Sequence, residues 1–97
     1  MQENFENFEK SKKAVILRKK MGEILKKTRI EKGFLSLNMF ALENNINRAN
    51  LSKIENGEVG CSILTAWRIS EALGLKLSDL IKKVETEVGS NITFIDT

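Results

Sequence analysis

Apolar residues recur every three or four positions along much of the chain, which is the spacing of one face of an α-helix. Lys32 and Gly33 supply a helix end, because a cation suits the last turn and glycine accepts a positive φ. Gly22 costs about 1 kcal/mol relative to alanine inside a helix, so the pattern allows one long helix or two that break there. The apolar positions of this first helical segment, 10–32, are Leu17, Met21, Ile24 or Leu25, and Thr28.

Four shorter helical segments follow, and each begins at a side chain that can accept a hydrogen bond from the first turn. Asn45 separates the first two and suits a left-handed turn, which asparagine tolerates better than most residues. Asn56 and Gly57 end the second of these segments, and Gly74 ends the third. The predicted segments, with their capping residues, are 37–44 (Ser36), 47–55 (Asn47), 62–73 (Ser62) and 79–87 (Ser78).

The chain therefore predicts an all-α fold with a short C-terminal exception. It has 97 residues, no proline and only six glycines, which suits one helical domain better than a β-sandwich or barrel. Residues 92–95 alternate in a β-prone run after a breaker at 89–91, so a short strand is expected there. We divide the chain into a basic, helical extension at 1–20, a domain at 21–83 and a tail at 84–97.

Several classes of protein are not expected from this composition. Cys61 is the one cysteine and histidine is absent, so neither an internal disulfide nor an ordinary zinc site is expected. The cysteine is interpreted as a plain loop thiol rather than a redox switch. No acid–base or nucleophile constellation stands out, so neither an enzyme nor a cofactor is expected. No secretion signal or membrane span is evident, which favours the cytoplasm.

Positive charge is concentrated in the N-terminal third. Residues 10–33 contain ten lysines and arginines against two glutamates, a formal charge of +8 within a chain of net +3. A charge run of this kind is either a solvated helix face or a surface that attracts phosphates. Charge alone leaves these two interpretations level.

The segment 37–57 carries the most informative pattern. Two helices that cross steeply over a short turn need inward apolar residues, one small residue at their contact and a flexible residue at the turn. Ala41 can provide the small contact and Asn45 the turn. The inward apolar positions are Phe40, Ile46, Leu51 and Ile54.

These residues resemble the Cro/CI (XRE-type) helix-turn-helix family of phage repressors and bacterial regulators. The resemblance spans about 21–83, and its most specific part is the run Leu51–Gly57. It implies a compact five-helix, lambda-repressor-like domain in which Asn47–Glu55 is the recognition helix. The chain departs from the family at Leu37, where glutamine is usual, at one extra residue after Gly33, at Asn44 and at Cys61.

The resemblance implies roles for exposed side chains near this helix. Arginine can pair with two acceptors of guanine, and asparagine with adenine, so the first half of the helix is expected to read bases. Helix N-termini and small polar residues are expected to contact phosphates. The residues expected to read bases are Arg48, Ala49, Asn50, Ser52 and Lys53. Those expected to contact phosphates are Ser36, Asn38, Asn47, Asn56 and Gly60.

Two further expectations concern the domain's interior. Arg29 and Glu55 resemble the family's internal ion pair, which ties the first helix to the recognition helix. Phe40 and Trp67 are interpreted as core residues rather than as a ligand platform.

Assembly and biological role follow from the motif. One recognition helix reads only a few base pairs, so a homodimer on an inverted-repeat operator in double-stranded DNA is expected. Repressor and activator stay open, as do phage, restriction–modification and plasmid contexts, with RNA polymerase as a further candidate partner. The alternative is an antitoxin or adaptor that binds a toxin or another protein, and an ordering of the tail on that partner would favour it. The candidate dimer residues are Leu77, Leu80, Ile81, Ile92 and Phe94.

Overall fold

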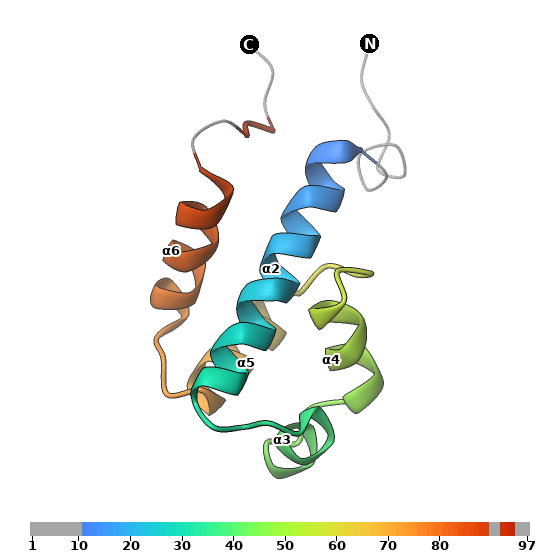
Figure 1. Cartoon of the computed structure of the whole chain (residues 1–97), viewed down its shortest axis with the longest axis vertical. Coiled ribbons are helices and arrows are strands. Elements are labelled where there is room, and N and C mark those ends of the chain that lie inside the picture. The colour runs from blue at the N-terminus through green and yellow to red at the C-terminus, as the bar shows by residue number, and fades with distance from the viewer. Residues whose placement is uncertain (1–10, 90–91, 95–97) are drawn as a thin grey trace.

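The computed structural model describes residues 11–89 and 92–94, and over these residues its regular secondary structure is entirely α-helical. The long helix α2 runs through the centre, with α4 on one side, α6 on the other and α3 at its lower end (Figure 1). This confirms the predicted all-α fold. The five helices are α2 (Lys12–Glu31), α3 (Leu37–Glu43), α4 (Arg48–Glu55), α5 (Ile63–Ala72) and α6 (Leu77–Val88).

Local side-chain chemistry starts three of the helices where the sequence predicts. The Ser36 and Ser62 hydroxyls each accept a hydrogen bond from the backbone N–H three residues further on, at 3.2 Å. The Asn47 carboxamide does the same at 2.8 Å. Asn45 adopts a φ of 53°, which makes it the one non-glycine residue with positive φ in the described part of the chain. The turn between α3 and α4 is therefore set by these few residues.

The N-terminal helix is unbroken at Gly22, because this glycine serves a contact between helices. A Cβ at this position would lie 2.5 Å from the carbonyl oxygen of Glu55 and would also meet that of Ile54. Only glycine allows α2 to approach the end of α4 so closely. The C-terminal helix begins two residues earlier than predicted, since the Asp79 carboxylate accepts a hydrogen bond from the Lys76 N–H and draws Ser78 into the first turn.

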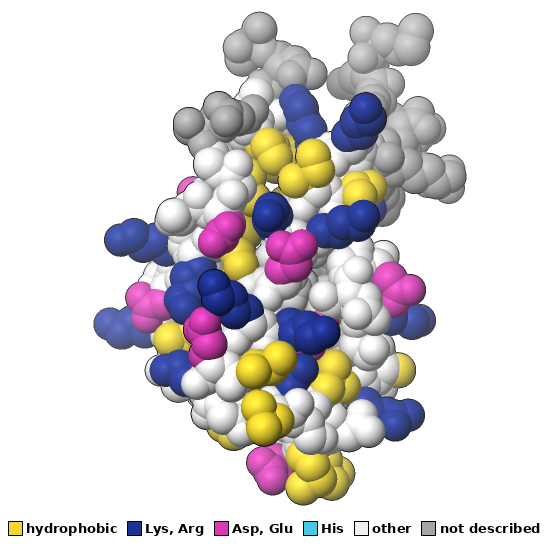
Figure 2. Space-filling model, viewed as in Figure 1, with side chains coloured by type: hydrophobic (Ala, Val, Ile, Leu, Met, Phe, Trp, Pro, Cys, Tyr) yellow, Lys and Arg dark blue, Asp and Glu magenta, His cyan; other side chains and the backbone are white. Residues whose placement is uncertain are grey.

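One core joins all five helices. Phe40, Leu51 and Leu80 have at most 1% of their surface exposed. The prediction for Trp67 was wrong, because 52% of this side chain is exposed on α5. Other apolar side chains are exposed on or next to α3, and such side chains gather at the lower end of the face in Figure 2. They are Leu35, Met39 and Leu42.

The strand predicted at 92–95 is not formed in its described part, and residue 95 lies outside the described residues. A lone strand needs a partner for its backbone groups, and no other strand exists in the described ranges. Thr93 instead accepts a hydrogen bond from the Lys13 ammonium at 2.6 Å, while Phe94 lines a groove with Leu17 and Ile81. The beginning of the tail therefore packs against α2 and α6.

Two kinds of feature are absent from the described residues: a helix that could span a membrane and a cluster of metal ligands. None of the helices there is both long enough and apolar enough to cross a membrane. In the same ranges, no three His, Cys, Asp or Glu side chains gather in a way that could hold a metal ion.

Candidate nucleic-acid interface

Arg68 fixes the turn between α3 and α4 from the neighbouring helix α5. Its guanidinium donates to the backbone carbonyls of Asn45 at 2.6 Å and Asn44 at 3.3 Å. These carbonyls precede the start of α4, where the chain changes direction. The orientation of α4 relative to α3 is therefore held by a side chain outside the two-helix unit, and sequence reasoning missed this residue.

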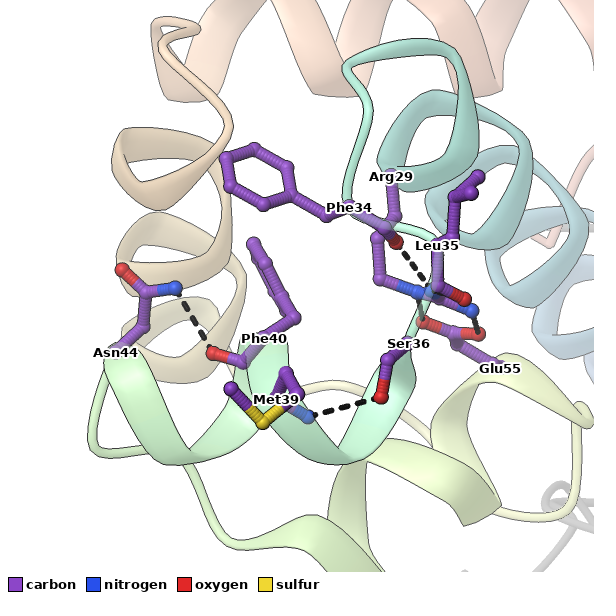
Figure 3. Close-up of polar contacts among 8 residues, drawn as sticks. All are labelled: Arg29, Phe34, Leu35, Ser36, Met39, Phe40, Asn44 and Glu55. Atoms are coloured by element: carbon purple, nitrogen blue, oxygen red, sulfur yellow. Dashed lines mark hydrogen bonds and ion pairs between the residues drawn. The ribbon is translucent and has the colours of Figure 1, made fainter.

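Arg29 joins three parts of the fold through one buried guanidinium (Figure 3). Its Nε donates to a carboxylate oxygen of Glu55 at 2.8 Å, and its Nη2 donates to the other oxygen at 3.1 Å. Its Nη1 donates to the carbonyls of Phe34 and Leu35, at 2.5 Å and 3.0 Å. The structure thus contains the ion pair expected from the resemblance, and it adds a link to the loop that precedes α3.

The outward face of α4 presents side chains that the protein itself leaves accessible. Leu51, Ile54 and Glu55 face the interior, while Arg48, Ala49, Asn50 and Lys53 are exposed and Ser52 is half-buried. A helix whose polar side chains point away from its own domain can enter the major groove of DNA and reach base edges. The exposure of these side chains therefore meets the geometric condition for the base-reading hypothesis.

A shallow hollow of about 430 Å³ brings residues of α3 and α4 together. Asn50, whose backbone N–H donates to the Asn47 side chain, is not part of it. Glu58 lines the hollow, and sequence reasoning missed it. Its position two residues after Asn56, a predicted phosphate contact, could have indicated that it lies at this surface. The residues lining the hollow are Leu37, Asn38, Arg48, Ala49, Ser52, Lys53 and Glu58.

The residues expected to contact phosphates fall into two groups. Ser36, Asn47 and Asn56 are exposed at helix ends beside this surface. The Ser36 hydroxyl and the Asn47 amide accept hydrogen bonds as caps, yet each keeps a donor for a phosphate. Gly60 lies elsewhere, in a groove of about 450 Å³ lined by residues of α2 and α6.

Cys61 lines the same groove as Gly60 and is half-buried there. Desolvation by burial raises the pKa of the thiol from 9.0 to about 11. The reactive thiolate is therefore scarce at neutral pH, which agrees with the interpretation of this residue as a plain loop thiol.

Comparison with known proteins identifies the family. A family model described as a helix-turn-helix domain matches residues 22–86. The chain is 40% identical over 68 residues to "Control protein C.MunI" of Mycoplasma sp, covering 70% of this chain and 92% of that protein. The solved clp gene regulator ClgR from C. glutamicum is similar with a TM-score of 0.65 at 25% identity, over 75% of this chain and 92% of that one. The chain belongs to the XRE-type helix-turn-helix family of DNA-binding transcriptional regulators.

Proposed function

We propose that the protein regulates transcription by binding an inverted-repeat operator in double-stranded DNA as a homodimer, with α4 in the major groove. The observation that carries this proposal is the exposed face of α4, which meets Asn38 of α3 in one hollow. Arg29 and Arg68 fix α4 and the turn before it from behind, so the helix is held in position before DNA arrives. Preorganised donors lose less freedom on binding and discriminate better between sequences.

Arg48 is proposed to read a guanine, since it is the first residue of α4 and lies at the rim of the hollow. Arg48→Ala is expected to lower discrimination at one position of each half-site by about 1–3 kcal/mol. Duplexes selected from a random pool measure this preference for the wild type and the variant. Lys76→Ala, at the start of α6, is the matched control. Unchanged discrimination in Arg48→Ala would remove this residue from base reading, and selection of no common sequence would overturn the proposed function.

The second copy is proposed to bind the exposed apolar row of α5. Ile63 and Leu64 are each 70% exposed there, and Trp67 is the most exposed large aromatic side chain in the described residues. Aromatic residues dominate the energy of protein interfaces. The row on α3 is a weaker candidate, because α3 contributes Asn38 to the hollow and must itself face DNA.

The dimer residues expected from the sequence fit this role less well. Leu80 has no exposed surface, so it is a core residue and cannot form an interface. Ile81 and Phe94 are 39% and 38% exposed and line a groove within their own chain. Leu77 and Ile92 are half-buried. The same packing of residues 92–94 on their own chain gives no support to the antitoxin or adaptor alternative.

Trp67→Glu is expected to weaken the dimer about 30-fold or more, which corresponds to about 2 kcal/mol for an interface anchor. Sedimentation velocity over a concentration series measures the dimer dissociation constant. Leu42→Glu, which changes a 76% exposed residue on α3, is the control and should leave dimerisation intact. The reverse pattern would move the dimer surface to α3, and no effect from either variant would exclude both rows.

A further inference from the structure

The N-terminal half of α2 extends past the end of the recognition helix. Gly57 follows Asn56, the C-cap residue of α4, and lies against the backbone of Lys19. A Cβ on this glycine would be 2.9 Å from the Lys19 Cα. Seven residues separate Lys12 from Lys19, so α2 continues for about 10 Å beyond this contact at 1.5 Å per residue. This part of α2 precedes the region matched by the family model, which begins at residue 22.

Lysines lie on the exposed side of this overhang. Lys12 and Lys19 are two helical turns apart, so they share one side of α2, and both are exposed. Lys13 points elsewhere, since its ammonium donates to the carbonyl of Thr93 in the tail. The acid next along this side is Glu23, whose carboxylate pairs with Lys20 at 3.5 Å. Figure 2 shows Lys and Arg side chains over this end of α2, and others along the edge where α4 lies.

A helix in the major groove has a sugar–phosphate backbone near each of its ends, because the groove is only about 12 Å wide. Lys19 stands beside the C-terminal end of α4, and the long, flexible side chain of lysine reaches well beyond its Cα. Lys12 continues the same line of positive charge. Phosphates that bound the groove at this end are the acceptors within reach of both side chains.

We propose that Lys12 and Lys19 form an additional, sequence-independent site for the phosphodiester backbone of the duplex, beside the end of α4 and outside the family domain. The inference rests on the proposed function and extends it. On this proposal, each interpretation of the basic segment applies to one side of α2. The side next to α4 contacts phosphates, whereas the side next to α6 is a solvated helix face. Each phosphate contact adds to affinity and to its salt dependence, and leaves base preference unchanged.

The test compares two double variants of the full chain on the selected operator duplex. In the homodimer, Lys12→Gln with Lys19→Gln removes two lysines from each copy. It is expected to reduce the slope of log K against log salt by about 3.6, or about 0.9 for each phosphate that is no longer neutralised. Between about 50 and about 200 mM salt, this change makes the fall in affinity about 100-fold smaller. The relative affinities for operator variants should stay the same.

Lys27→Gln with Lys83→Gln is the control, because these lysines line the cleft between α2 and α6 on the other side and the net charge changes equally. A much smaller change of slope is expected from this pair. Equal changes in both pairs, or no change in the first, would overturn the proposed site. If the wild type selects no sequence at all, the proposed function fails instead, so the two failures are distinguishable.

Discussion

Glu55→Ala is expected to lower the free energy of unfolding by about 3–5 kcal/mol, the usual cost of leaving a buried charge without its partner. Arg29 would keep its position with its side chain only 5% exposed, and its Nε and Nη2 would be left without their carboxylate acceptor. Urea unfolding followed by circular dichroism measures the change, which should appear as a lower midpoint at an unchanged slope. DNA binding should fail only as far as folding fails.

Two further variants distinguish the effect of leaving a buried charge unpaired from the effect of losing any ion pair. Glu23→Ala breaks the ion pair with Lys20, in which the Lys20 side chain is 39% exposed and the Glu23 side chain 66%. This change should lower the free energy of unfolding by less than about 1 kcal/mol. Arg29→Met combined with Glu55→Leu should be less destabilised than Glu55→Ala, because no unpaired charge stays buried. A Glu55→Ala protein as stable as the wild type would show that the pair does not hold α2 and α4 together.

Gly22→Ala is expected to destabilise the fold by about 1–3 kcal/mol or more, although alanine favours an exposed helix by about 1 kcal/mol over glycine. The added Cβ would lie 2.5 Å from the Glu55 carbonyl oxygen, and the obstacle is backbone, which cannot rotate away as a side chain can. Thermal unfolding of the wild type and the variant measures the difference.

Gly60→Ala is the matched control, since a Cβ there meets nothing within 4 Å. It should leave stability nearly unchanged or raise it slightly through the unfolded chain. A rise in stability for Gly22→Ala would mean that α2 and α4 are further apart than the structure has them.

Sequence reasoning predicts features that depend on neighbouring residues. The caps at Ser36, Asn47 and Ser62 and the left-handed Asn45 are confirmed, because each is set by the chemistry of a few consecutive positions. The exposed face of α4 is also predicted, because its polar side chains lie at helical positions opposite the buried Leu51 and Ile54.

Features that depend on distant parts of the chain were missed or misread. Trp67 resembles a core residue in isolation, but the packing of α5 leaves 52% of this side chain exposed. Gly22 resembles a weak point until α4 is placed against it. Arg68 and Lys19 have no local signal, because only the packing of helices brings them to the turn and to the end of α4.

The single guanidinium of Arg29 has a consequence for the partner rather than for the protein. It ties α2, the loop at 34–35 and α4 to one another, so α4 cannot pivot independently. Under the proposed function, α4 therefore cannot adjust to an imperfect DNA site. Misfit must then be absorbed by the duplex, through twist and bending whose cost varies with base sequence. The affinity for different operators should therefore also depend on the stiffness of base pairs that no side chain contacts.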